Sequence, residues 1–402
     1  MKLGLVVPRY GEDVVGGIEH WLRLLCEHLV ALKGWDVEVF TTCAVSAATW
    51  ADELPPGDSE LAGVRVHRRR SVSGRDPRSG ALGVMVRYGP SVVPDPVARR
   101  FVELVGPVCP DVIDAAAASD CDLVAVTPYL FWPAPAAAPR LGRRMIFHPA
   151  AHDEPELHLP VMRAVFGAVG GLAYNSYAEQ ALVERTFRVA HLPAGVIGAS
   201  VVEGTGEPEA ARAALGLAPG ERFVLCVGRV ERAKGSHVLA EMWRLYRSRR
   251  PGAPRLVLLG PVHEALQGDD DVVVAGRQPE PVKWGAFQAC ELAVSPSAWE
   301  SFSLVVLEAW LAGAAVLVNR RCEATLEHCL RSRGGMSFFD YADFETVVDR
   351  LLGDRRLREQ LVSNGRSYTR RVFDWSALVD RYEALADRVL ATTALGTTVT
   401  TG

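Results

Sequence analysis

Two glutamates, Glu300 and Glu308, lie in one of the most apolar stretches of the chain. Glu308 has apolar neighbours on both sides within the segment 304–312. Because an ionised carboxylate is costly to bury alone, this acid is expected to have a specific partner. Carboxylates accept hydrogen bonds from hydroxyl groups, and a ribose or a hexose offers several of them. The pair therefore predicts a sugar-binding role.

The residues between these acids predict a helix that begins near Ser303. The first backbone N–H groups of a helix have no intrahelical partners, and the helix dipole favours an anion beside them. Those of Leu304 and Val305 can hold a phosphate, with Glu300 in the loop before the helix and Glu308 more than one turn into it. A phosphate flanked by sugars on both sides predicts a nucleotide-sugar site. The alternative is an amphipathic helix with one acid facing solvent.

A second loop carries two basic residues, Arg229 and Lys234, in the segment GRVERAKGSHVL. An Arg and a Lys on one loop can clamp a diphosphate and stabilise its charge as it leaves. Only four of the 44 basic residues are lysines, so Lys234 is expected to have a particular role. The alternative is two exposed basic side chains on an ordinary loop.

Strands and helices alternate in both halves of the chain, which predicts an α/β fold with two Rossmann-like domains. The segment 193–208 is rich in Gly and Pro and is interpreted as a linker. We expect an N-terminal domain at 1–196, a C-terminal domain at 197–374, a last helix at 375–392 and a disordered tail at 393–402. The predicted strands are 3–7, 37–41, 123–127, 145–147, 172–175, 223–227, 256–259, 272–275, 292–295, 315–318 and 336–339.

The segment with Glu300 and Glu308 and the loop with Arg229 and Lys234 both resemble signatures of glycosyltransferase family 4. ESFSLVVLEAWLAGAAVLV is similar to the family pattern E-x-F-G-x-x-x-x-E-A, except that Ser303 stands where the family usually has Gly. The loop with Arg229 and Lys234 resembles G-R-x-x-x-x-K-G. Gly16 and Gly17 precede a predicted helix and resemble the family's G-G-x-E loop, which faces the donor phosphates. The resemblance implies the GT-B architecture, in which two Rossmann-like domains face a central cleft and the C-terminal helix crosses back to the N-terminal domain.

The resemblance also implies an activity: a retaining, metal-independent glycosyltransferase that moves a sugar from a nucleotide-diphosphate sugar to a hydroxyl acceptor. UDP is the expected nucleotide, and a small-molecule or lipid-linked acceptor is expected, as in carbohydrate or natural-product biosynthesis. The implied donor-binding residues are Gly16, Gly17, Arg229, Lys234, Arg277, Ser303, Leu304, Val305 and Glu308. Glu308 would bind the ribose, Glu300 would bind the donor sugar, and Arg277 would border the base.

A histidine-rich segment, HPAAHDEPELHLP, follows the predicted strand 145–147. The family carries a histidine near the donor sugar at the end of such a strand, and His152 matches its H-D-E-P variant best, with His148 as the alternative. A neutral imidazole there could hydrogen-bond a sugar hydroxyl. The segment lacks metal-ligand spacing, and Asp269 to Asp271 precede a strand instead of following one, so no metal or other cofactor is expected.

Composition excludes some partners. A net charge of −4 implies no general attraction to nucleic acid. The eight cysteines contain no C-x-x-C pair, and with no cleavable signal pattern this favours a reduced, cytoplasmic protein. The longest apolar run contains Glu308, which makes it a poor membrane span.

The segment 64–101 is arginine-rich and is interpreted as a solvated surface, with contact to an anionic acceptor or a membrane surface as the alternative. Two other functions stay open on the sequence alone: a nucleotide-sugar epimerase of the same architecture, and a non-catalytic nucleotide-sugar binding protein.

Overall fold

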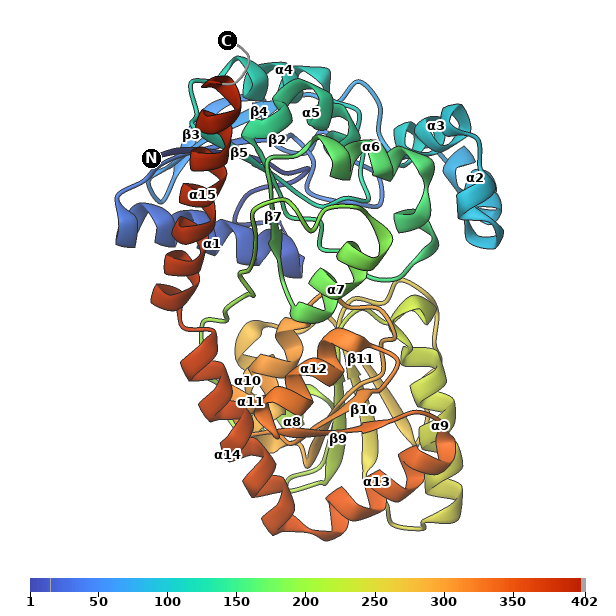
Figure 1. Cartoon of the computed structure of the whole chain (residues 1–402). Helices are drawn as coiled ribbons and strands as arrows, with labels where there is room; N and C mark the ends of the chain where they lie inside the picture. The colour runs from blue at the N-terminus through green and yellow to red at the C-terminus, as the bar shows by residue number, and fades with distance from the viewer. Residues whose placement is uncertain (15, 399–402) are drawn as a thin grey trace. The chain divides into compact units, whose positions relative to one another are not determined.

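The computed structural model describes residues 1–14 and 16–398. The chain forms two compact units (Figure 1): residues 1–199 together with the segment from Trp375 onward, and residues 200–374. Each unit is α/β and is built on its own sheet, as the sequence predicted. Within the described ranges, no helix is both long and apolar enough to cross a membrane.

The sheet of the first unit has the order β3-β4-β2-β1-β5-β6-β7-β8. All neighbours are parallel except β3 and β4. Central strands such as β5, with the sequence LVAV, are buried throughout, because helices cover both faces of a parallel sheet. The strands are β1 (Lys2–Val6), β2 (Asp36–Thr42), β3 (Gly57–Leu61), β4 (Val64–Arg69), β5 (Leu123–Val126), β6 (Met145–Phe147), β7 (Gly171–Tyr174) and β8 (Ala194–Val196).

The last helix, α15 (Trp375–Thr398), belongs to the first unit, where it packs on α1 (Gly17–Lys33). One stripe of it is buried, including Tyr382 and Leu385. Lys33 of α1 forms ion pairs of 2.6 Å with Asp380 and Glu383. The other helices of this unit are α2 (Arg78–Tyr88), α3 (Asp95–Val105), α4 (Pro110–Ala118), α5 (Pro133–Leu141), α6 (Pro160–Ala168) and α7 (Tyr177–Thr186), with 3-10 turns η1 (Pro90–Val92), η2 (Gly142–Arg144) and η3 (Pro155–His158).

The sheet of the second unit is parallel and has the order β11-β10-β9-β12-β13-β14. Its strands are β9 (Phe223–Val227), β10 (Arg255–Leu259), β11 (Val272–Gly276), β12 (Leu292–Ser295), β13 (Val316–Asn319) and β14 (Gly335–Phe338). Its helices are α8 (Pro208–Ala214), η4 (Arg232–Lys234), α9 (Ser236–Arg249), α10 (Glu280–Ala289), α11 (Leu304–Ala312), α12 (Glu323–Ser332), α13 (Tyr341–Gly353) and α14 (Arg355–Val372).

β8 and the end of α15 differ from the sequence-based expectation. β8 lies inside the predicted linker 193–208, because a three-residue strand flanked by Pro and Gly reads as a loop. α15 continues to Thr398, past the predicted end at 392, and Thr392 and Thr393 donate hydrogen bonds to the carbonyls of Arg388 and Val389 inside it. Residues 399–402 of the predicted tail lie outside the described residues.

Candidate functional site

The centre of the second sheet contains a point where the strand order reverses. The chain moves outward from β9 to β10 and β11, and then returns to place β12 on the other side of β9. In open parallel sheets, ligands bind outside the carboxyl ends of the strands at such a point. The loops after β9 and β12 are residues 228–235 and 296–303, the two segments in which the sequence predicts the diphosphate clamp and the acidic pair.

An ion pair joins these two loops. The Nζ of Lys234 lies 2.7 Å from Oε1 of Glu300, and the two side chains are 26% and 21% exposed. Gly235 lets the loops approach, because a Cβ at this position would lie 2.7 Å from the carbonyl oxygen of Pro296 and its φ of +75° disfavours other residues. The structure therefore brings together two residues that the sequence had predicted for one site.

Side chains from β13 and α12 contact the backbone of the loop 296–303 and hold it in place. Asn319 donates a hydrogen bond of 2.9 Å to the Pro296 carbonyl, and His328 Nε2 lies 3.0 Å from the Phe302 carbonyl. Burial lowers the pKa of His328 to about 4, so this ring is neutral at physiological pH and donates to the carbonyl. These contacts hold Glu300 near the start of α11.

α11 begins at Leu304, where the sequence predicts the start of a helix that could hold an anion. Ser303 is the residue before the helix, and no side chain caps the helix start. The backbone N–H groups of Leu304 and Val305 are in the first turn, where helical residues lack intrahelical acceptors, and both residues are only partly buried. The positive end of the helix dipole lies in the same place, so this end of α11 favours an anion.

Ser303 has φ +77° and ψ 85°, in the left-handed region that favours glycine. The departure from the family pattern is therefore a strained position. We expect Ser303→Gly to raise the free energy of unfolding by about 1 kcal/mol, because the left-handed strain of about 1–2 kcal/mol exceeds the extra flexibility of Gly in the unfolded chain. Urea unfolding measures the change. Ser301→Gly, at a position without positive φ, is the control, and equal stabilisation by both replacements would contradict the strain argument.

Glu308 has the specific partner that its apolar surroundings predict. Its Oε1 lies 2.9 Å from Nζ of Lys283 on α10, and the two side chains are 12% and 14% exposed. Burial raises the pKa of Glu308 above its ordinary value, although Lys283 opposes the shift. Burial alone would lower the pKa of Lys283, but Glu308 and Glu280 raise it above its ordinary value. Sequence reasoning missed Lys283, although the scarcity of lysine was a usable signal.

The other two basic candidates lie at the same edge of the sheet. Arg229 follows β9 and pairs with Glu231 at 3.2 Å, with half of its side chain exposed. Arg277 directly follows β11 and is exposed. The predicted roles of Arg229 and Arg277 in donor binding remain predictions.

The two candidate histidines of the first unit have different surroundings. His148 is buried, and its Nε2 lies 2.9 Å from the hydroxyl of Tyr382 on α15. Burial lowers the pKa of His148 to about 3, so it is a neutral packing residue. His152 lies in the loop after β6 with 27% of its side chain exposed, and its Nδ1 is 3.4 Å from Glu154. His152 is thus the more accessible of the two rings.

A buried carboxyl group supports the loop that carries His152. Glu179 accepts hydrogen bonds of 2.6 Å from the backbone N–H groups of Ala151 and Asn175. Burial raises its pKa to about 8, although these N–H groups oppose the shift. Ser176 caps α7 by accepting from the Glu179 backbone, as the sequence predicts. The sequence assigned Glu179 only to this capping box, because its contact with Ala151 is not local.

The glycine pair of the first unit precedes α1. A Cβ on Gly16 would lie 2.1 Å from a carboxylate oxygen of Glu19, so a larger residue would have to displace the Glu19 side chain. Glu19 in turn pairs with Arg9 of the loop after β1, through Nε at 3.1 Å. Gly17 is the first residue of α1. The G-G-x-E motif therefore folds as a closely packed turn at the carboxyl end of β1.

The arginine-rich segment 64–101 has more acidic partners than its own sequence suggests. Arg65 pairs with Asp36 at 2.8 Å and with Glu38, and Arg69 pairs with Asp58 at 2.9 Å. Acids outside the segment thus neutralise part of it, as expected for a solvated surface.

Acidic residues in two further segments also form local contacts. Asp269 accepts hydrogen bonds of 2.8 Å from the backbone of Asp271 and Val272, which forms the turn that the sequence predicted. His158 lies 2.8 Å from Asp153. Among the described residues, no group of three or more His, Cys, Asp or Glu side chains is placed to hold a metal ion.

Residues 208–368 match the family model described as glycosyl transferases group 1. A D-inositol 3-phosphate glycosyltransferase from Nocardia farcinica is 34% identical over 174 residues, which is 38% of this chain and 38% of that protein. The chain thus matches well under half of the length of this curated relative.

Solved structures match nearly the whole chain. A sucrose-phosphate synthase from Thermosynechococcus elongatus has a TM-score of 0.69 at 20% identity and covers 97% of this chain and 99% of its own. HepE from Anabaena, in complex with UDP and glucose, has a TM-score of 0.67 at 17% identity and covers 96% of this chain and 100% of its own. These neighbours have the GT-B fold, so the predicted fold class is confirmed.

Proposed function

We propose that this protein transfers a sugar from a UDP-sugar to a hydroxyl of a small acceptor, because residues 208–368 match the family model of the group 1 glycosyl transferases. One observation carries the proposal. The Lys234–Glu300 pair joins the two loops at the strand reversal beside the open start of α11. A diphosphate and a sugar can bind there side by side.

The second unit supplies the donor contacts. The ammonium group of Lys234 has three N–H donors, and Glu300 takes one of them, which leaves two for a phosphate. The first N–H groups of α11 and the guanidinium of Arg229 would hold the rest of the diphosphate. Glu308 would accept hydrogen bonds from the ribose, Glu300 would accept them from the donor sugar, and Arg277 would border the base.

The chemistry is a substitution at the anomeric carbon. The bond from this carbon to the diphosphate oxygen breaks, and its electron pair goes to the phosphate. A bond forms to the acceptor oxygen, whose proton passes to a phosphate oxygen of the leaving group. The sugar keeps its configuration because the acceptor attacks from the face that the diphosphate leaves. Lys234, Arg229 and the dipole of α11 stabilise the developing charge, so the reaction requires no metal.

The first unit would supply residues on the acceptor side. His152 would contact a donor-sugar hydroxyl, and Gly16 and Gly17 would keep the loop after β1 small enough to lie near phosphates. The name of the Nocardia farcinica relative favours a phosphorylated polyol as the acceptor class. Part of the arginine-rich segment 64–101 would then contact the acceptor phosphate.

UDP as the nucleotide is favoured by the UDP-bound HepE structure. A thermal-shift titration of the wild-type chain with UDP, GDP, ADP and dTDP tests it, with UMP as the control for the second phosphate. We expect UDP to raise the Tm most and UMP much less, because a ligand that binds only the folded state stabilises it by mass action. A product assay with UDP-glucose and inositol phosphate then tests transfer. A chain that no diphosphate stabilises would refute the proposed donor site.

A further inference from the structure

The helix α14 is strongly basic in a chain with net charge −4. Its sequence, RRLREQLVSNGRSYTRRV, contains six arginines and a single acid, Glu359. Some of these arginines line a groove of about 700 Å³ in the second unit. This groove lies apart from the candidate donor site, because its other wall comes from the residues before β12 and β13, at the opposite edge of the sheet from the loops 228–235 and 296–303.

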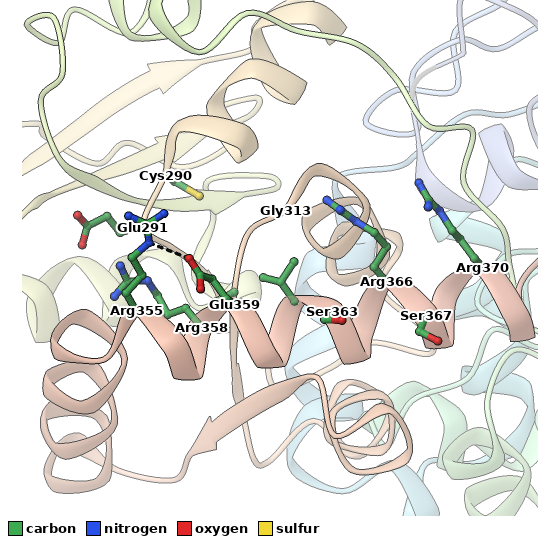
Figure 2. Close-up of a pocket in the computed structure, with 12 residues that line it drawn as sticks. Cys290, Glu291, Gly313, Arg355, Arg358, Glu359, Ser363, Arg366, Ser367 and Arg370 are labelled. Atoms are coloured by element: carbon green, nitrogen blue, oxygen red, sulfur yellow. Dashed lines mark hydrogen bonds and ion pairs between the residues drawn. The ribbon is translucent and has the colours of Figure 1, made fainter.

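One face of α14 forms the long wall of the groove, as Figure 2 shows. The side chains on this face recur at intervals of three and four residues, which places them on one side of a helix. The opposite wall includes Cys290 and Glu291 before β12, and Gly313 and Ala315 before β13. The α14 residues that line the groove are Arg355, Arg358, Glu359, Val362, Ser363, Arg366, Ser367 and Arg370.

Within the part of the chain that the structure describes, the two central arginines, Arg358 and Arg366, form no ion pair with an acid. Arg366 donates from Nε and Nη2 to the carbonyls of Trp310 and Leu311, at 3.3 and 3.0 Å. Arg358 donates from Nη1 to the carbonyls of Leu351 and Leu352. Each guanidinium has five N–H donors, so both keep several for a ligand. These carbonyls lie in the last turns of α13 and α11, where the helix dipole supplies a partial negative charge of about 0.5, so each guanidinium keeps part of its positive charge.

The acids at the groove are already paired. Glu359 accepts from Arg355 at 2.7 Å, and Glu291 accepts from Arg222, through Nη2 at 2.7 Å. Ser363 lies between Arg358 and Arg366, Ser367 follows Arg366 on the same face, and both serines are exposed. The groove therefore presents guanidinium groups and hydroxyls together, the groups that recognise phosphate oxygens.

We propose that the α14 groove binds a soluble small molecule that carries at least two phosphate groups. Arg358 and Arg366 are eight residues apart, which is about 12 Å along a helix at about 1.5 Å per residue. Their guanidiniums are held at the ends of two different helices, α13 and α11, so two phosphate groups of one ligand can each contact one of them. Val362 contributes the main apolar surface on the α14 wall. A membrane-binding face would carry a larger apolar surface, so the groove favours a soluble ligand.

Titration calorimetry with tripolyphosphate tests the site. The Lys234→Ala chain is used to weaken binding at the candidate donor site, and variants are compared within this background so that the result does not depend on the proposed function. In this background, Arg355→Gln with Arg370→Gln removes two charges from the ends of the groove. The matched control is Arg356→Gln with Arg371→Gln, which removes two charges from the same helix at positions that do not line the groove.

We expect the groove pair to raise the Kd for tripolyphosphate at least tenfold and the control pair to change it less than twofold. Equal weakening by both pairs would show diffuse attraction to a basic helix and would overturn the proposal. Ser363→Glu, which places an acid in the middle of the groove, is expected to raise the Kd at least tenfold, and an unchanged Kd would also overturn it. Stronger binding to phosphatidic acid vesicles than to tripolyphosphate would identify a headgroup instead of a soluble ligand and would overturn it as well.

Discussion

Lys234→Ala is expected to lower kcat/KM for the UDP-sugar by about 10²–10³-fold, the typical loss when one group that stabilises a developing charge is removed. Lys234 lies at the strand reversal and contacts the loop before α11 through Glu300. It is the cation best placed to neutralise a diphosphate there. The replacement also leaves Glu300 without this cation, so a bound diphosphate would meet an acid that Lys234 no longer neutralises.

Initial-rate kinetics and the UDP thermal shift measure the effect of Lys234→Ala together. Lys33→Ala is the matched control, because Lys33 also pairs with acids, Asp380 and Glu383, but lies in the first unit on α1. We expect Lys33→Ala to keep kcat/KM within about twofold. The Lys234–Glu300 pair is partly exposed, so its loss changes stability by only about 1 kcal/mol or less. A Lys234→Ala enzyme with wild-type kcat/KM would remove the diphosphate clamp from the mechanism.

The sequence predicted the elements around the candidate site closely, and the reason is burial. β9 and β12 have the predicted bounds, because central parallel strands are covered on both faces and appear as continuous apolar runs. The helix start at Leu304 was predicted because a polar loop precedes a long apolar run. The sequence assigned Lys234 and Glu300 to one donor site, but the ion pair between them was not predicted.

The missed features depend on contacts between distant residues or lack an apolar pattern. β3 and β4 form an antiparallel pair, but β3 has the polar sequence GDSEL and is mostly exposed, so no burial pattern marked it. The strain at Ser303 is a backbone conformation that a side-chain pattern does not encode. Lys283 meets Glu308 only because α10 packs on α11, and that packing depends on the whole second sheet.

The Lys283–Glu308 pair gives the largest expected effect on stability. Lys283→Met leaves the buried Glu308 carboxylate without its cation, and breaking a buried pair from one side costs about 3–5 kcal/mol. The pKa of Glu308 is already raised by burial, and the loss of Lys283 raises it further. A carboxyl group whose pKa is higher in the folded than in the unfolded state favours folding least at high pH. The stability that Lys283→Met loses should therefore grow as the pH rises above 4.5, the ordinary pKa of a glutamate.

Urea unfolding of Lys283→Met at pH 5 and pH 8 measures this deficit, which we expect to be clearly larger at pH 8. The double variant Lys283→Met with Glu308→Met is the control, because it removes both charges from the buried site. We expect it to recover most of the lost stability, since apolar residues often replace a buried ion pair without loss. It should still fail to bind UDP, because the proposed ribose contact is gone. If Lys283→Met lost less than about 1 kcal/mol at both pH values, Glu308 would have to be stabilised by something other than this ion pair.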